Sequence, residues 1–253
     1  MPRTARKKSE SGIYHIILRG INKQIIFEDE EDKEKYLEIL EQCKVASGCS
    51  IFAYCLMGNH IHMLVQQGNE DIGMFMRRIG ARYVYWYNWK YKRCGPLFQD
   101  RYKSEEVEDD SYFLVVLRYI HRNPVKAGVT KEAVDFKWSS YHDYIHNTPK
   151  IAEIDYALNM FDKERIKAIE AFKHYCEEEN EDYCLDMEEG SKLRDEVALE
   201  IILMLCNIKC GNEIQKFDTK VRNAYLNELR KKGISTRQLE RLTGVSRAII
   251  LKL

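Results

Sequence analysis

The chain has 253 residues, of which 45% are hydrophobic and 32% are charged, and its formal net charge is zero. A chain of this length can bury a substantial core and has room for two domains. It has no apolar run near the ~20 residues that a membrane span needs and no signal-peptide pattern, so we expect a cytoplasmic protein without a membrane partner. The eight cysteines include no C-x-x-C pair, which favours reduced thiols over a zinc site.

The zero net charge conceals an uneven distribution. Residues 72–103 hold eight lysines and arginines against one acid, residues 151–200 hold sixteen acids against six bases, and residues 201–253 hold eleven bases against four acids. Two basic regions around an acidic one predict two surfaces that could meet a polyanion, although a helical charge run is often only a solvated face. Aromatic residues interleaved with the first basic region favour the polyanion.

Hydrophobic periodicity and turn signals predict seven elements in the first part of the chain. In chain order they are a strand at 13–19, a helix at 30–46, strands at 50–57 and 60–66, a helix at 72–92, a strand at 98–107 and a helix at 110–123. Gly58-Asn59 between the second and third strands is a usual sequence for a tight hairpin turn. Asp110 or Ser111 should cap the last helix, and Pro124 should end it.

This order of elements is that of a ferredoxin-like layer. It predicts an α+β fold in which helices cover an antiparallel sheet. We expect a basic arm at 1–12, this domain at 13–145, an acidic helical linker region at 146–191 and a small all-α unit at 192–253.

The C-terminal unit has the spacing of a helix-turn-helix over residues 234–250. Ser235 or Thr236 would cap its first helix, and Ser246 would cap the second. The alternative is a helical hairpin that only packs. The candidate DNA contacts of this unit are Arg237 and Arg247.

Two histidines share one face of the third predicted strand. Side chains alternate along a strand, so His60 and His62 point the same way, while Ile61 and Met63 point into the opposite, apolar layer. On a rigid strand the two imidazoles form a preorganised pair of metal ligands. The alternative is two half-exposed histidines, and a short H-x-H motif alone does not decide between them.

The helix at 110–123 brings a tyrosine and an amide together. Its apolar stripe has the spacing that faces a core and consists of Phe113, Val116, Leu117 and Ile120. Tyr119 and Asn123 are four residues apart and lie together on a different face. The ordinary alternative is an amphipathic tyrosine at a domain edge, in a chain with sixteen tyrosines.

Four segments carry these residues in an order and spacing that resemble the IS200-like single-tyrosine transposases, and within that group the REP-associated tyrosine transposases. They are YHIILRG at 14–20, LMGNHIH at 56–62, FQDRYKS at 98–104 and RYIHRNPV at 118–125. The resemblance spans roughly residues 13–144 and closes with WSSY at 138–141.

The resemblance implies the fold of the HUH nucleases and a metal-dependent enzyme that cleaves and rejoins single-stranded DNA near a hairpin. His60 and His62 fill the family's histidine–hydrophobic–histidine metal motif. Tyr119 falls at the position of the nucleophile, and Asn123 at that of a third, amide ligand, where many relatives carry Gln. Cleavage in this family leaves a 5′-phosphotyrosine and a free 3′-hydroxyl, and the reverse step joins a new end. The resemblance further implies Mg²⁺ or Mn²⁺ as cofactor, and a homodimer is one option, since many relatives exchange the tyrosine helix.

Basic residues near these motifs are candidate DNA contacts. In the helix at 72–92, with its aromatic residues, they could hold phosphates beside stacked, unpaired bases. Those on the predicted fourth strand would share one face. The candidates are Arg19, Arg77, Arg78, Arg82, Arg101 and Lys103. Two other functions stay open: a DNA-binding regulator that keeps the fold without the chemistry, and a replication or mobilising nickase that shares the chemistry.

Overall fold

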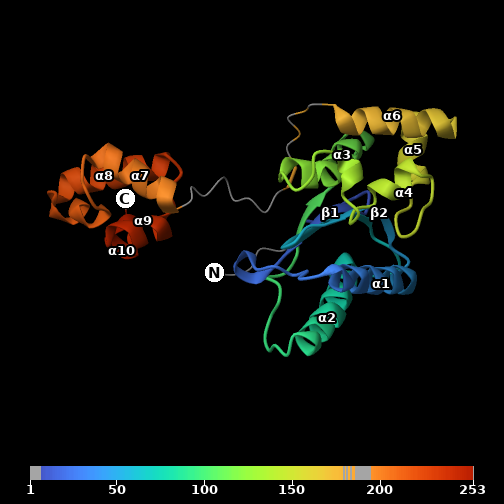
Figure 1. Ribbon diagram of the computed structural model, residues 1–253, viewed down its shortest axis with the longest axis horizontal. Helices are drawn as coiled ribbons and strands as arrows, with labels where there is room; N and C mark the ends of the chain where they lie inside the picture. Colours follow the sequence, from blue (N-terminus) through green and yellow to red (C-terminus); the bar gives the residue numbers. More distant parts are fainter. Residues whose placement is uncertain (1–6, 179, 181, 183, 186–194, 253) are drawn as a thin grey trace. The chain divides into compact units, whose positions relative to one another are not determined.

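Three segments rich in β-branched and aromatic residues and one short polar segment pair into a single antiparallel sheet (Figure 1). They are β1 (Ile13–Arg19), β2 (Ser50–Leu56), β3 (His60–Gln66) and β4 (Lys103–Glu106). In this computed structural model, which describes residues 7–178, 180, 182, 184–185 and 195–252, the sheet has the order β2-β3-β1-β4. The predicted α+β fold with an antiparallel, ferredoxin-like sheet is therefore confirmed.

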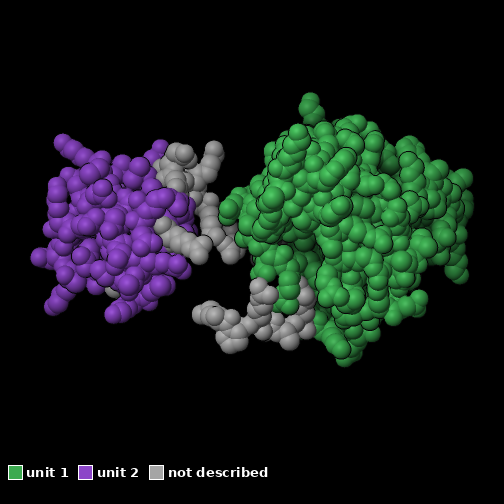
Figure 2. Space-filling model, turned by 90° about the horizontal axis from the view of Figure 1, so that it is seen from below, with its two compact units in different colours: residues 1–185 green, residues 186–253 purple. Residues whose placement is uncertain are grey.

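The chain divides into two compact units, residues 1–185 and residues 186–253, which Figure 2 colours separately. The sheet belongs to the first unit, and helices cover both of its faces. The first two helices lie on one face and the third on the other (Figure 1); they are α1 (Glu30–Ser47), α2 (Ile72–Lys90) and α3 (Asp110–Lys126).

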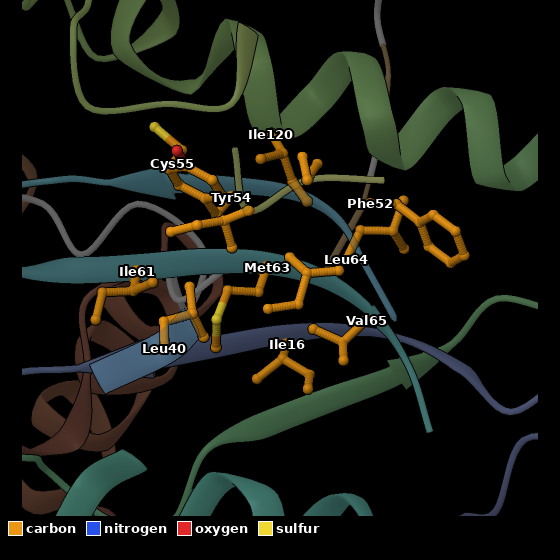
Figure 3. Packing of buried hydrophobic residues seen from close by; sticks show 14 of the residues in the cluster. Ile16, Leu40, Phe52, Tyr54, Cys55, Ile61, Met63, Leu64, Val65 and Ile120 are labelled. Carbon is orange, nitrogen blue, oxygen red and sulfur yellow. The ribbon is translucent and has the colours of Figure 1, made fainter. Parts of the chain in front are cut away.

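Alternation along β3 divides the core between these two layers. Ile61 and Met63 lie on the face of α1, where Leu40 packs, and Leu64 lies on the face of α3, near Ile120 (Figure 3). All five side chains are fully buried. The sheet therefore separates an apolar layer on one side from the layer that receives the two β3 histidines.

The start of α3 differs from its predicted cap. Asp109, rather than Asp110 or Ser111, is the N-cap residue, and its carboxylate accepts a hydrogen bond from the backbone N–H of Tyr112 at 2.8 Å. Three consecutive residues there are all good caps, so composition alone could not choose among them.

Pro124 does not end α3, contrary to the sequence prediction. The helix continues two residues further, to Lys126, although Pro124 lacks the N–H that would bond one turn back. The carbonyl of Pro124 still accepts from the N–H of Val129 at 2.9 Å, and that of Asn123 accepts from Ala127 at 2.9 Å. Asn123 therefore lies inside the last full turn of the helix.

The fourth strand is shorter than predicted. Phe98 forms only an isolated bridge with Gly20, the chain then bends, and regular pairing begins at Lys103. In the bend the side chain of Asp100 accepts a hydrogen bond from the N–H of Arg101 at 2.8 Å. Arg101 thus lies outside the strand, and the prediction that it shares a strand face with Lys103 was wrong.

The first unit extends beyond the domain end expected at residue 145. Three short or medium helices follow α3, namely α4 (Tyr141–Ile145), α5 (Asp155–Phe161) and α6 (Arg165–Glu177). Phe172 of α6 is fully buried and stacks on Tyr144 with ring centroids 4.6 Å apart. We expected this segment to be a linker. Burial of Phe172 instead makes it part of the core of the first unit. Short 3-10 helices occur at Ile21–Lys23 and Ala133–Asp135.

The second unit is helical and has its own small core. Its helices are α7 (Asp195–Cys206), a 3-10 helix (Gly211–Lys216), α8 (Thr219–Lys231), α9 (Thr236–Thr243) and α10 (Arg247–Ile250). Ser235 caps α9 with a capping box to Gln238, as expected. Ser246 precedes α10 but its side chain makes no capping bond; Glu240 accepts from the N–H of Arg247 instead, at 2.9 Å.

Within the described residues, none of the helices is both long enough and apolar enough to cross a bilayer.

Candidate active site

The face of β3 that carries His60 and His62 is largely closed to solvent. His62 is fully buried, and His60 is partly buried. In the antiparallel register His62 lies opposite Ile17 of β1, and His60 lies opposite Arg19. Directly paired residues share a face, so β1 extends the surface on which the two imidazoles lie.

Helix α3 covers this face and directs two polar side chains at the histidines. Its predicted apolar stripe is buried in the core. Tyr119 and Asn123 are also buried, with 4% and 7% of their surface exposed, rather than projecting from an open surface. The ring of Tyr119 packs edge-on against the ring of His62, with centroids 5.6 Å apart. The tyrosine, the amide and the two histidines therefore meet in one place.

The amide of Asn123 lies between the two histidines. Its Oδ1 is 3.4 Å from Nε2 of His60, and its Nδ2 is 3.2 Å from Nε2 of His62. The other ring nitrogen of His60, Nδ1, is 2.7 Å from Oδ1 of Asn59, whose Nδ2 donates to the carbonyl of Lys23. Asn59 can therefore only accept from His60, so Nδ1 of His60 carries the proton.

This proton assignment turns two acceptors toward each other. A neutral His60 that donates through Nδ1 presents the lone pair of Nε2 to the amide oxygen of Asn123. Nδ2 of Asn123 donates to Nε2 of His62, so that nitrogen also presents a lone pair. Turning the amide over would instead place its oxygen against Nε2 of His62 and its Nδ2 against His60. In the orientation that the structure has, a cation among the three groups would relieve the contact between the amide oxygen and Nε2 of His60.

The donor set fits a divalent metal ion. Two imidazole nitrogens and an amide oxygen are ligands that Mn²⁺ accepts readily and that Mg²⁺ accepts with additional water. Over the residues that the structure describes, no group of three or more histidine, cysteine or acidic side chains could hold a metal ion. An ion at this site would thus depend on the amide of Asn123 as well as on the histidines.

The charge state of His62 suits a ligand. Burial, followed by the neighbouring His15, His60 and Lys126, holds the pKa of His62 well below its ordinary value of 6.5. The ring is therefore neutral at physiological pH, which is the form that binds a metal.

Lys126 is a further residue of this region that sequence reasoning missed. It follows Tyr119 and Asn123 at helical spacing on α3, and its Nζ lies 4.9 Å from the centre of the Tyr119 ring. The side chain is exposed and brings a positive charge to the tyrosine. The i, i+4, i+7 spacing from Tyr119 is a sequence signal that could have found it.

His15 and Glu105 were also missed. Nε2 of His15 lies 3.2 Å from Nδ1 of His62, and both rings are fully buried. On the far side of His15, its Nδ1 lies 3.9 Å from Oε2 of Glu105. His15 is the largest influence on the pKa of Glu105, which falls to about 2, and the hydroxyl of Tyr112 lowers it further while burial opposes both.

The predicted DNA contacts fall into three groups. Arg19 and Lys103 lie on the sheet face of the histidines, since Arg19 pairs with His60 and Lys103 pairs with Ile17. Arg101 lies in the bend before β4. The structure does not bring the arginines of α2 to the histidines, because α2 covers the opposite face of the sheet (Figure 1). These are Arg77, Arg78 and Arg82.

The α2 arginines have partners of their own. Arg78 pairs with Glu70 at 2.6 Å, and Arg82 donates to the side chain of Gln42 at 3.3 Å. In the second unit Arg247 is exposed at the start of α10. Arg237 falls within α9, but its side chain lies outside the described residues. None of these observations tests DNA binding, which stays a prediction.

Part of the chain is similar to known proteins. Residues 8–123 match the family described as "Transposase IS200 like". A protein of Haemophilus influenzae described as a REP-associated tyrosine transposase is 29% identical over 102 residues, which cover 36% of this chain and 57% of that protein. The chain thus spans little more than half the length of this relative.

A solved structure of a REP-associated tyrosine transposase bound to a REP hairpin shares the fold. It has a TM-score of 0.52 at 16% identity, covering 61% of this chain and 96% of the other. Residues 8–123 thus resemble the IS200-like transposases, and the chain shares its fold with a REP-associated tyrosine transposase.

Proposed function

We propose that the first unit nicks and rejoins single-stranded DNA at hairpin-bearing sites, with Tyr119 as the nucleophile. A divalent ion, Mg²⁺ or Mn²⁺, would be held by His60, His62 and Asn123. The observation that carries this proposal is the position of the Asn123 amide, within 3.4 Å of Nε2 of His60 and 3.2 Å of Nε2 of His62, one helical turn from the tyrosine. Members of this family generally use a divalent metal, which supports the ligand assignment.

Tyr119 would supply the attacking oxygen. A bond forms between its hydroxyl oxygen and the phosphorus of a phosphodiester, the bond from phosphorus to the 3′-oxygen breaks, and the hydroxyl proton ends on that 3′-oxygen. The products are a 5′-phosphotyrosine and a free 3′-hydroxyl. Because the covalent intermediate keeps the energy of the diester, attack by another 3′-hydroxyl reverses the step and joins a new end without ATP.

The chemistry explains why these residue types occur together. A phosphodiester is negatively charged and resists attack by an anion, and tyrosine is a weak nucleophile at its ordinary pKa of about 10. When bound, a divalent metal supplies positive charge to a non-bridging phosphate oxygen and to the departing 3′-oxygen. The buried ring of Tyr119, packed against His62, holds the hydroxyl group in a defined direction.

Hairpin DNA is the partner that we propose. The related solved structure holds a REP hairpin, and this supports the same class of DNA here. Arg19 and Lys103, on the sheet face of the histidines, are the candidates placed to hold phosphates beside the site. A homodimer is not required for the chemistry, since all four side chains come from one chain.

We also propose that the second unit contacts duplex DNA through its helix-turn-helix spacing. The capped helix α9, the turn at Gly244 with φ 70°, and the exposed Arg247 at the start of α10 support this role. A stem-binding unit beside a nicking unit would suit a substrate that combines a hairpin with an unpaired flank.

The test is a covalent trapping assay. The purified chain is incubated with single-stranded hairpin oligonucleotides and Mg²⁺ or Mn²⁺, and a denaturing gel then separates protein–DNA adducts. We expect an adduct that needs metal, that disappears in Tyr119→Phe, and that persists in Tyr85→Phe, which alters an exposed tyrosine of α2. Tight DNA binding without any adduct would instead identify a DNA-binding regulator.

A further inference from the structure

A chain of buried polar groups runs away from the candidate metal site, behind His62. Nδ1 of His62 meets Nε2 of His15 at 3.2 Å, and Nδ1 of His15 faces Oε2 of Glu105 at 3.9 Å. The two histidine rings stack with centroids 5.4 Å apart and an interplanar angle of 26°. Both are fully buried, so water does not compete for these nitrogens.

The positions of the protons along this row of side chains follow from the groups at its two ends. At one end Nδ2 of Asn123 donates to Nε2 of His62, so a neutral His62 carries its proton on Nδ1. That proton is donated to Nε2 of His15, and a neutral His15 that accepts there carries its own proton on Nδ1. At the other end Nδ1 of His15 faces the carboxylate of Glu105, an acceptor. One set of tautomers satisfies the two hydrogen-bonded contacts and turns the remaining proton of His15 toward the carboxylate 3.9 Å away.

The carboxylate is itself held in place. The hydroxyl of Tyr112 donates to Oε2 of Glu105 at 2.6 Å, and the backbone N–H of Leu185 donates to the same oxygen at 3.0 Å. Glu105 has a lowered pKa, of about 2, and is ionised at neutral pH. A fixed, negatively charged acceptor thus stands behind His15.

We propose that Glu105 and His15 are positioning residues that keep His62 in the tautomer and orientation in which its Nε2 lone pair points at the metal. This inference rests on the proposed function and deepens it. Without an acceptor at Nδ1, a neutral imidazole is free to carry its proton on Nε2, and that tautomer cannot bind a metal through Nε2. Neither residue touches the substrate or the metal.

The first measurement is the affinity of the metal-free protein for Mn²⁺, by calorimetry at one fixed pH. His15→Leu removes the acceptor, and we expect Mn²⁺ binding to weaken by about 10- to 100-fold, the range found for residues that orient metal ligands. His15→Gln restores an acceptor near the position of Nε2 and should recover most of the affinity. Glu105→Ala should weaken binding less than His15→Leu, since it acts one group further away.

His121 provides the matched control. It is also fully buried, its Nε2 lies 2.8 Å from Oγ of Ser140, and it does not contact the metal ligands in the described structure. His121→Leu makes the same chemical change at a comparable cost in stability. If both leucine variants weakened Mn²⁺ binding equally, loss of packing would explain the effect and the positioning role would be overturned.

The second measurement reads the tautomer directly. Histidine ¹⁵N spectra of the metal-free protein distinguish a proton on Nδ1 from a proton on Nε2. We expect Nδ1–H for His62 in the wild type and in His15→Gln, and a mixture or the Nε2–H form in His15→Leu. An unchanged His62 spectrum in His15→Leu would overturn the inference even if that variant were less stable.

The experiments distinguish a failure of the proposed metal site from a failure of the proposed positioning role. If the wild-type chain bound no Mn²⁺, the metal assignment in the proposed function would be wrong, while the ¹⁵N spectra would still decide whether His15 sets the tautomer of His62. If Mn²⁺ bound normally and His15→Leu changed neither affinity nor tautomer, the metal site would stand and the positioning role would not.

Discussion

Nδ2 of Asn123 lies 3.2 Å from Nε2 of His62, although 61 residues separate them in the chain. The contact joins the last turn of α3 to the middle of the sheet. In this orientation the oxygen of the same amide faces His60. The geometry of the candidate metal site therefore depends on one side chain that reaches both histidines.

Replacing this amide should weaken the metal site without unfolding the chain. In Asn123→Ala we expect Mn²⁺ affinity to fall by about tenfold or more, because one of three ligands is lost while the two histidines remain. Asn123→Asp, which adds a charged oxygen, should bind Mn²⁺ at least as tightly as the wild type. Calorimetry measures both. Asn88→Ala on α2, whose amide donates to the carbonyl of Gly95, is the control and should leave the affinity unchanged.

Lys126 should influence the rate of the chemical step. Its ammonium group, 4.9 Å from the Tyr119 ring centre, favours the negative charge that develops on the phenolic oxygen and on the phosphate. Lys126→Gln should slow adduct formation by about 5- to 10-fold, and Lys126→Arg should retain most of the rate. Because Lys126 is exposed, added salt should reduce the difference between wild type and Lys126→Gln. If Lys126→Gln formed the adduct as fast as the wild type, the proposed effect of Lys126 on the chemical step would be contradicted.

Glu105 should make stability depend on pH in the acid range. Its pKa falls from an ordinary 4.5 to about 2 in the folded chain, so the ionised carboxylate stabilises the fold above pH 4.5 and this contribution is lost as the pH falls toward 2. Glu105→Gln should therefore be less stable than the wild type at pH 7 and nearly equal to it near pH 2. Urea denaturation of the two proteins across this range measures the difference. A difference that does not shrink on acidification would contradict the lowered pKa.

The two groups of basic residues should behave differently toward DNA. Arg19→Ala, on the sheet face of the histidines, should weaken single-stranded DNA binding and lower the slope of log K against log salt by about 1, as expected for one lost phosphate contact. Arg77→Ala, on α2 across the sheet, should change adduct formation less than Arg19→Ala does. The opposite ranking in a binding titration at several salt concentrations would place the DNA on the α2 side.

Local patterns predicted the strands well where they were regular. The limits of β1 and β3 agree with the structure because alternation and a hairpin turn define them within a few residues. The prediction of β4 was too long, because the bend at Asp100 depends on a local side-chain hydrogen bond and on pairing with β1 that no periodicity records. Pro124 was expected to end α3, but backbone bonding continues past it, from the N–H of Ala127 to the carbonyl of Asn123.

Some residues of the candidate site could be predicted from local spacing, and others could not. His60 and His62 share a strand, and Tyr119 and Asn123 share a helix face, so spacing alone could group each pair. His15 and Glu105 could not be found by spacing, because they reach the site only through the register of β1 with β3 and β4. The arginines of α2 were grouped with the site by charge, and the sheet separates them from it (Figure 1).

The most direct test of the central claim is to identify the residue that becomes linked to DNA. Trypsin cuts after Arg118 and Arg122 and releases the tetrapeptide YIHR, in which Tyr119 is the first residue. After reaction with a hairpin oligonucleotide and nuclease trimming, mass spectrometry should find this peptide carrying a 5′-phosphate-linked nucleotide on its tyrosine. A nucleotide on any other tyrosine-containing peptide, with YIHR unmodified, would contradict the assignment of Tyr119 as the nucleophile.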